Sequence, residues 1–302
     1  MFFCRTQKTE LATMPKSKGI LYLLAAYLIW GSMPLYWHLL SHITPEEIVA
    51  HRILWSAVFM LILAGVVFKT DFRSIFKSRK KMLYLLCTSV LITANWALYI
   101  WAVANKHIVD ASLGYYINPF INVILGMFFF KERLTRIQVI AILFALFGVV
   151  YLTLSYGTFP FVAIILALTF AFYALLRKKA KVEAMPALTV ETAIALPVAL
   201  GFLSMTFINH TNSYLLSDVS TVLLLMMAGP ITSVPLYFFG KASETVSMTT
   251  LGFFQYLSPT LQLLIGIFLF GESFTAAHIV CFCAIWLGLA FYTVHLLKSG
   301  NS

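Results

Sequence analysis

The chain has 302 residues, of which 61% are hydrophobic and only 11% are charged. A soluble domain carries about 25% charged residues, so this composition excludes an ordinary water-facing surface and favours a protein of the lipid bilayer. The 21 Lys and Arg residues exceed the 11 Asp and Glu residues and give a net charge of +10. The excess lies in short clusters between apolar runs, as in the loops of a membrane protein, and not in the stripe typical of a nucleic-acid-binding protein.

The chain begins with a polar, mildly basic segment, residues 1–18, which we expect to be cytoplasmic. The apolar run that follows, 19–40, is long enough to span a membrane and lacks a small-residue cleavage site, so we expect no secretory signal. The cysteines have no spacing of a disulfide framework, a metal site or a cofactor site, and none of these is expected. They are Cys4, Cys87, Cys281 and Cys283.

Apolar runs of spanning length recur along the whole chain. A spanning helix needs about 20 residues, because about 30 Å of hydrocarbon is covered at about 1.5 Å per residue. The expected spans are 19–40, 48–68, 82–104, 111–130, 137–154, 160–176, 187–207, 221–239, 248–270 and 277–297. The fifth and sixth could be fused into one helix, but Gly157 and Pro160 indicate a break between them. The sequence therefore predicts an all-α integral membrane protein with ten transmembrane helices.

The basic residues predict how these helices are oriented. With the N-terminus in the cytoplasm, every Lys and Arg except Arg52 and Lys106 lies on the cytoplasmic side or at its membrane boundary. Loops that stay in the cytoplasm carry an excess of Lys and Arg. We therefore expect a multi-pass protein of the bacterial inner membrane with both termini, including the tail 298–302, in the cytoplasm.

Two stretches about 140 residues apart share an ordered series of residues. Pro119, Gly126 and Glu132 correspond to Pro259, Gly266 and Glu272, within a series that extends over about 55 residues. The series predicts two five-span repeats, 19–154 and 160–297. Because five is odd, the copies must insert with opposite orientation, and the loops agree: 69–81 is rich in Lys and Arg, whereas its counterpart 208–220 has none. Inverted repeats around a shared site are typical of secondary transporters.

Several longer segments resemble a known family. Both halves close their fourth span with Gly-x-Phe-x-Phe-x-Glu-x-x-Thr, at 126–135 and 266–275. Further segments read AYLIWGSMPLYW at 26–37, NWALYIWAV at 95–103, SLGYYINP at 112–119 and LGFFQYLSP at 251–259. Together they resemble the EamA branch of the drug/metabolite transporter superfamily and, within it, the RarD subgroup of predicted permeases. The resemblance implies a ten-helix inner-membrane permease; it does not specify the solute, since relatives move amino acids, nucleotide precursors, drugs and other metabolites.

Arg52 is the most informative charged residue, because it lies inside the second span. A charged side chain in hydrocarbon costs from about 2.5 kcal/mol upward, so it should face a cavity, a partner or the interface. The functional interpretation is a clamp for an anion or carboxylate. The alternative is snorkelling to the headgroups or pairing with Glu46 or Glu47. The adjacent His51 is a weaker gate candidate.

Glu191 occupies the corresponding position in the seventh span, near the opposite membrane face. A carboxyl group in a low-dielectric site can take up a proton near neutral pH, so proton coupling is one interpretation. The alternative is a fixed salt bridge with Arg177 or Lys178. Because the repeats are inverted, Glu191 and Arg52 should not pair directly.

Uncharged polar and aromatic residues at mid-span supply the remaining candidates. Buried amides in lipid need partners, so they should face inward, either to the solute or to another helix. Prolines such as Pro119 and Pro259 kink helices at positions that are often close to transport sites. Most aromatic residues should belong to the interface or to packing. The predicted solute-binding residues are Trp30, Arg52, Asn95, Tyr99, Tyr115, Asn118, Tyr237, Gln255 and Tyr256, and the predicted coupling or gate residues are His51 and Glu191.

The sequence thus predicts a permease, and more specifically an exporter, for a small organic solute. Its cavity should lie among the first, third and fourth spans and their repeat mates. The chain has no Walker motif, so ATP does not supply the energy within it. The alternatives are an intramembrane enzyme, for which HExxH, GxSxG and paired aspartates are missing, and a regulatory membrane protein. The partners expected are the solute and the lipid bilayer, and no nucleic acid. A proton-coupled cycle and simple facilitated exchange both fit the sequence.

Overall fold

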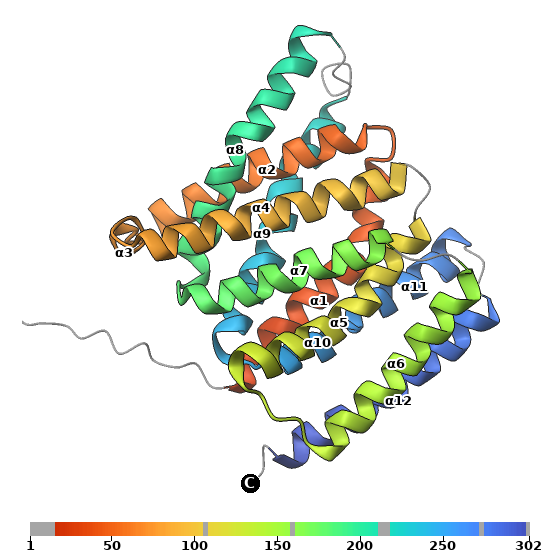
Figure 1. Ribbon diagram of the computed structural model, residues 1–302. Helices are drawn as coiled ribbons and strands as arrows, with labels where there is room; N and C mark the ends of the chain where they lie inside the picture. Colours follow the sequence, from red (N-terminus) through yellow and green to blue (C-terminus); the bar gives the residue numbers. More distant parts are fainter. Residues whose placement is uncertain (1–15, 105–107, 158–160, 211–217, 272–274, 300–302) are drawn as a thin grey trace, which may run out of the picture.

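The computed structural model describes residues 16–104, 108–157, 161–210, 218–271 and 275–299, and over these ranges it is helical with no strand. Figure 1 shows long helices that lie side by side, with α6 and α12 forming a pair at one margin. The helices are α1 (Lys16–Leu39), α2 (Pro45–Ile62), the π-helix η1 (Leu63–Val67), α3 (Arg73–Phe76), α4 (Arg79–Ala104), α5 (Ile108–Phe130), α6 (Arg136–Tyr156), α7 (Phe161–Ala180), α8 (Ala184–Ile208), α9 (Val219–Thr245), α10 (Met248–Gln255), α11 (Leu257–Phe270) and α12 (Ala276–Ser299). Residues 1–15 of the expected N-terminal segment and 300–302 of the expected tail lie outside the described ranges.

Eight helical segments in the described ranges are long and apolar enough to cross a membrane, and two shorter apolar helices, Gly114–Phe130 and Ala276–Tyr292, accompany them. Large apolar side chains cover the outside of the bundle. Phe128 and Phe268 are 79% and 78% exposed. A contiguous apolar exterior of this kind suits lipid and not water. The predicted all-α membrane class is confirmed.

The helix boundaries follow the expected spans with one exception. α6 and α7 are separate helices, as Gly157 predicted: this residue adopts φ +69° and its N–H donates to the carbonyl of Leu154. Pro160 lies outside the described residues. The expected ninth span is broken into α10 and α11 at Tyr256, near Pro259, which has no N–H to donate to the carbonyl four residues earlier. Its repeat mate Pro119 lies inside the continuous helix α5.

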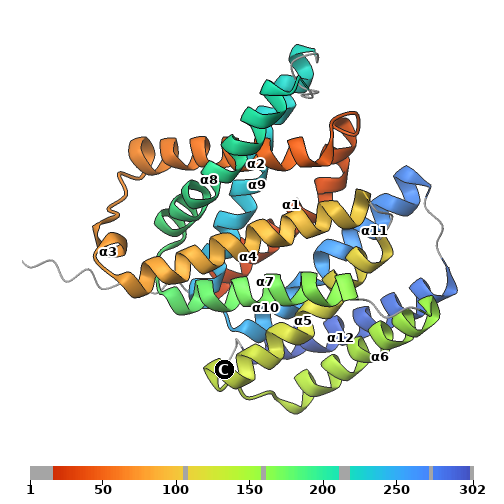
Figure 2. The same cartoon turned by 45° about the horizontal axis from the view of Figure 1, so that its top comes forward.

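Each half of the chain packs against the other as well as against itself. α1 packs on α9 and α11, whereas α7 packs on α4 and α5. α2 contacts α8 and α9, α4 contacts α8, α5 contacts α10, and α6 lies along α12. The turned view in Figure 2 again shows α6 and α12 side by side at the edge of the bundle. α2 and α9 pack backbone against backbone, since a Cβ placed on Gly229 would lie 2.6 Å from the backbone N of Ser56.

The two ends of the bundle differ in how their helices stop. Lys69, Lys131 and Lys181 follow η1, α5 and α7 with φ values of 45°, 55° and 49°. We call this end, where α1 begins, the basic end. Three helices that stop at the opposite end, α6, α8 and α11, are followed instead by Gly157, His210 and Gly271 in the same left-handed region. Glycine is the usual residue at this position because it carries no Cβ penalty.

Candidate functional site

Arg52 lies inside the bundle, on α2, and is held by aromatic rings. Its Cζ lies 4.7 Å from the ring centroid of Trp37 on α1 and 4.7 Å from that of Trp96 on α4. Its Nε donates a 3.1 Å hydrogen bond to Oγ1 of Thr232 on α9. The charge is thus stabilised by cation–π contacts from two helices. Neither Glu46 nor Glu47 is among its described partners.

Two tyrosines lie in the neighbourhood of this arginine. Tyr99 on α4 and Tyr115 on α5 pack edge to face, with ring centroids 6.0 Å apart, and both lie within electrostatic range of the Arg52 guanidinium. We call Trp37, Arg52, Trp96 and Thr232 the arginine box. Sequence reasoning selected Arg52, Tyr99 and Tyr115, and the structure brings these three together.

A small cavity begins next to the arginine box. It is lined by Ile53 and Ser56 of α2, Trp96 of α4, and Glu191 of α8, with further walls from Ile92, Thr93, Tyr173, Leu188, Thr192, Ala195 and Leu236. Its free volume is of the order of a single water molecule. α2 and α8 contribute to this lining, whereas the sequence placed the cavity among the first, third and fourth spans and their mates.

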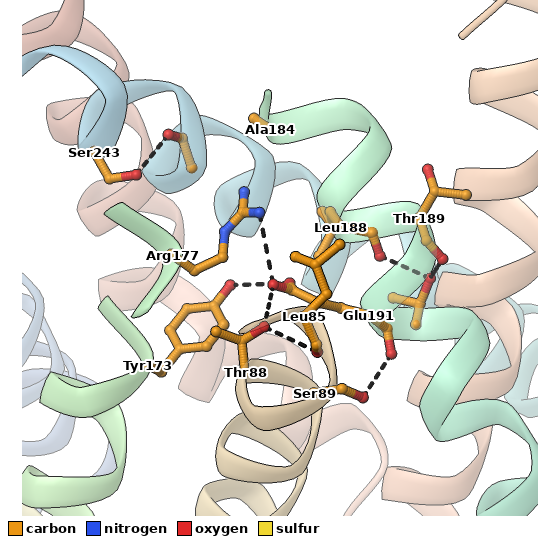
Figure 3. Close-up of polar contacts among 12 residues, drawn as sticks. Leu85, Thr88, Ser89, Tyr173, Arg177, Ala184, Leu188, Thr189, Glu191 and Ser243 are labelled. Carbon is orange, nitrogen blue, oxygen red and sulfur yellow. Dashed lines mark hydrogen bonds and ion pairs between the residues drawn. The ribbon is translucent and has the colours of Figure 1, made fainter. Parts of the chain in front are cut away.

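Glu191 ends the cavity on its other side and is fully engaged (Figure 3). Its Oε1 lies 3.6 Å from Nη1 of Arg177 and accepts a 2.7 Å hydrogen bond from Oγ1 of Thr88. The hydroxyl of Tyr173 donates to Oε2 at 3.5 Å, and Ser89 Oγ donates to the Glu191 carbonyl at 2.7 Å. The side chains of Glu191 and Arg177 are each 2% exposed. The structure thus contains the salt bridge with Arg177, one of the two pairings considered from the sequence, and Glu191 and Arg52 do not pair.

The mid-span amides form a chain of contacts between helices. Asn95 donates to the carbonyl of Leu166 at 2.9 Å and to Thr169 at 2.8 Å, which ties α4 to α7. Asn118 donates to the carbonyl of Ala167 at 2.6 Å. Asn122 donates to Asn118 Oδ1 at 2.8 Å and to Gln255 Oε1 at 3.2 Å, which connects α5 to α10. These contacts join helices of both halves across the centre of the bundle.

The remaining predicted residues lie elsewhere in the core. Trp30 packs in an aromatic cluster, with its ring centroid 5.9 Å from that of Phe170 and 5.7 Å from that of Phe239. Tyr237 packs on Phe68 near the basic end, with ring centroids 6.3 Å apart. Tyr256 lines a second small cavity, between α5, α6 and α10. His51 is buried on α2, with 6% exposure.

A carboxylate at the basic end joins the two halves. Glu132, just after α5, accepts hydrogen bonds from the backbone N–H of Met248 at 2.8 Å and of Thr249 at 3.0 Å, and from Thr249 Oγ1 at 2.7 Å. It therefore caps the N-terminus of α10, whose first N–H groups have no partner within the helix. Its predicted repeat mate Glu272 lies outside the described residues.

Sequence reasoning missed four partners: Trp37, Trp96, Thr232 and Thr88. The two tryptophans are typical of interface or packing residues, and a single threonine in an apolar run carries no signal. Each becomes important only through a contact with another helix, as between Thr88 and Glu191.

The chain is similar over most of its length to bacterial membrane proteins. Residues 17–154 match the EamA-like transporter family. The chain is 40% identical over 278 residues to Protein RarD of Escherichia coli (strain K12), covering 92% of this chain and 94% of that protein. It is 42% identical over 291 residues to an uncharacterized transporter of Pseudomonas aeruginosa, covering 96% and 97%, and 38% identical over 285 residues to the uncharacterized transporter YojE of Bacillus subtilis, covering 93% and 95%.

A solved crystal structure shares the fold. It aligns with a TM-score of 0.72 over 93% of this chain and 98% of that chain, at 17% identity. At this identity the likeness concerns the helix arrangement alone.

Proposed function

This chain belongs to the EamA-like transporter family, and from that membership we propose that it is a secondary transporter that exports a small organic solute across the bacterial inner membrane by alternating access. The family makes it a membrane transporter. The proposal adds alternating access as the mechanism, export as the direction of transport, and the inner membrane as the location. It also adds two inverted five-helix repeats, 19–154 and 160–297, which together form ten spans.

The helix neighbours support the repeats. If α1, α2, α4, α5 and α6 correspond to α7, α8, α9, α10–α11 and α12, then the most extensive packing pairs have counterparts. The contact of α1 with α9 corresponds to that of α7 with α4, and the contact of α2 with α9 corresponds to that of α8 with α4. The pairs α2 with α8, α5 with α10 and α6 with α12 correspond to themselves. A pseudo-two-fold axis would produce this pattern.

The cavity beside Glu191 is the observation on which the proposal depends. It is lined by α2 and α8 and by α4 and α9, two complete pairs of corresponding helices, with Tyr173 of α7. A site shared in this way by both halves can be opened to either side when the halves rock against each other. We propose that it widens into the solute site, with Arg52, Tyr99 and Tyr115 on one side.

The other predicted residues have supporting roles in this proposal. Glu191 is the candidate for proton coupling, because releasing it from Arg177 would let it exchange a proton with the cavity. His51 is a candidate gate residue on the same helix as Arg52. Trp30, Asn95, Asn118, Tyr237, Gln255 and Tyr256 remain proposed contacts of the solute or of the moving helices.

The composition of the basic end supports an orientation of the protein in the membrane. Lys69, Lys131 and Lys181 all lie there, and Lys and Arg favour the cytoplasm. We propose that the basic end, with both termini, is cytoplasmic and that the arginine box lies towards the outer face.

Counterflow in proteoliposomes tests the function. A thermal-shift screen of the purified protein against metabolites and drugs first identifies binders, since a ligand of the folded state raises the melting temperature. Each binder is then placed inside the vesicles, and uptake of its labelled form is measured. We expect saturable counterflow for at least one binder and none in empty vesicles. Conversion of a binder to a product would instead favour an intramembrane enzyme, and binding without counterflow would favour a regulatory protein.

A further inference from the structure

We infer that the arginine box binds the carboxylate group of an organic anion, so that the transported solutes are carboxylates whose carbon skeleton occupies the adjacent cavity. This inference rests on the proposed transport function and specifies its substrate class. It is carried by the contacts of Arg52, by their contrast with those of Arg177, and by the position of Trp96.

The first observation is that Arg52 has hydrogen-bond donors to spare. A guanidinium carries five N–H donors in a planar fork that matches a carboxylate. In the described residues, only Thr232 accepts one of them, from Nε. Trp37 and Trp96 stabilise the charge through their π-systems but offer no acceptor comparable to oxygen. The Nη donors are therefore available to an acceptor that the described protein does not supply.

The second observation is the contrast between two arginines inside the same bundle, the partly buried Arg52 and the buried Arg177. Arg177 has a carboxylate of its own, since Glu191 lies 3.6 Å away and is itself held by Thr88. No described carboxylate lies within ion-pair distance of Arg52. A buried charge is costly unless a counter-charge and hydrogen bonds compensate for it. We conclude that Arg177 is neutralised within the fold, whereas Arg52 is left for an anion from outside it.

The third observation places the rest of the solute. Trp96 contacts Arg52 and also lines the cavity, so it forms a wall common to both. The next residue of α2, Ile53, lines the same cavity, together with apolar groups such as Ile92 and Ala195. A carboxylate on Arg52 would direct its apolar portion along Trp96 into this space. The edge-to-face tyrosines Tyr99 and Tyr115 lie within electrostatic range of Arg52 and add polar groups to this region.

The test compares carboxylates with their uncharged amides. The probes are benzoate and benzamide, phenylacetate and phenylacetamide, and butyrate and butyramide, each titrated into purified full-length protein while melting temperature and tryptophan fluorescence are followed. We expect at least one carboxylate to bind about tenfold or more tightly than its amide, because charge-assisted hydrogen bonds contribute about 1.5–3 kcal/mol. Equal affinities throughout, or no binding by any carboxylate, would overturn the inference.

Variants assign the preference to the arginine. Arg52→Gln should remove the carboxylate preference, whereas Arg79→Gln, which removes an exposed arginine at the start of α4, should leave it unchanged. If Arg52→Gln does not fold, Arg52→Lys keeps the charge but loses the fork, and a smaller preference is expected. A full preference in any folded Arg52 variant would contradict the assignment.

Transport measurements distinguish a failure of the proposed substrate class from a failure of the proposed transport function. Saturable counterflow of an uncharged or cationic solute that no carboxylate inhibits would leave the transport function intact and overturn the substrate class. The absence of counterflow by any binder would overturn the function itself.

Discussion

Single residues decide how this bundle tolerates charge in its interior. Arg52 and Arg177 are both surrounded by apolar helices, yet one is covered by two indole rings and the other is paired with Glu191. The two solutions have different consequences for substitution. Removing Arg52 should damage transport, whereas removing a member of the pair should damage the fold.

Replacing Arg52 by Ala should therefore lower transport far more than expression. We expect a loss of about tenfold or more in the initial rate of counterflow, because the guanidinium supplies charge-assisted hydrogen bonds. The rate is measured in proteoliposomes at equal protein content, with Arg79→Ala as the control for lost positive charge. Unchanged transport by purified Arg52→Ala would show that the box has a structural role only.

Glu191→Gln should reduce stability and remove any flux that a pH gradient drives. The change leaves Arg177 without a counter-charge, and breaking a buried pair costs about 3–5 kcal/mol. Thermal unfolding in detergent and flux with and without a pH gradient provide the measurements. Glu183→Gln, on an exposed residue before α8, is the control. pH-driven flux that survives in the variant would rule out Glu191 as the coupling group.

For single residues, the sequence indicated which charges inside the bundle matter but not which side chains contact them. An arginine within an apolar run must be functional or compensated, so Arg52 could be selected from its position alone. Its partners could not: Trp37 and Trp96 lie on other helices, and Thr232 is 180 residues away. The choice of Arg177 over Lys178 depends on which face of α7 is turned towards Glu191, and that is a tertiary property.

Helix ends and helix crossings form the next scale. Glu132 holds the start of α10, and Lys178 of α7 donates to the carbonyls of Ser243 and Val246 just before it. The turn between α9 and α10 is thus held by two charged side chains. The Glu132 carboxylate accepts from its backbone N–H groups, and the Lys178 ammonium donates to its backbone carbonyls. Glu132 belongs to the first half and α10 to the second, so any rocking of the halves must strain this cap.

Glu132→Ala should accordingly lower stability by about 1–2 kcal/mol, the usual cost of losing an N-terminal cap. It should also raise the accessibility of the basic end. The melting temperature gives the first quantity, and the modification rate of a cysteine at Thr249, with and without the change, gives the second. Glu46→Ala, on an exposed carboxylate in the first turn of α2, is the control and should change neither by much. Equal modification rates would show that the cap does not restrain opening.

Two glycines form a matched pair for testing the helix crossing. A Cβ on Gly229 would lie 2.6 Å from the backbone N of Ser56, whereas a Cβ on Gly201 in α8 meets nothing within 4 Å. Gly229→Ala should destabilise the protein by about 1–3 kcal/mol, because backbone cannot yield as a side chain can. Gly201→Ala should be neutral or stabilising by up to about 1 kcal/mol. Equal melting temperatures for the two variants would show that α2 and α9 can separate freely.

The whole molecule was the easiest scale to predict in outline. Hydropathy located the helices because spanning length is fixed by the bilayer, and Gly157 marked the boundary between α6 and α7. The break at Tyr256 was harder to predict from the sequence. Pro119 and Pro259 have the same local sequence signal, yet only Pro259 lies beside a broken helix. The lining of the cavity by α2 and α8 depends on helix packing, which periodicity does not specify.

Orientation of the whole chain is tested by labelling single cysteines in a cysteine-free variant. Ser74→Cys lies at the basic end and Ser41→Cys at the opposite end, and both positions are exposed. A membrane-impermeant maleimide applied to intact spheroplasts should label position 41 and spare position 74 until the membrane is opened. Labelling of position 74 in intact spheroplasts would reverse the proposed sidedness and remove the support for an inward-facing basic end.

The lysines in the left-handed region at the basic end have opposite effects on the stability of the folded protein and on its orientation during synthesis. After folding, Gly at positions 69, 131 or 181 would relieve backbone strain of about 1–2 kcal/mol per residue. During synthesis, the same exchange would remove a cation that helps the translocation machinery to retain that loop. A more heat-stable variant made in this way would therefore insert more of its copies with inverted topology. Stability screens on purified protein would then favour sequences that insert incorrectly in the cell.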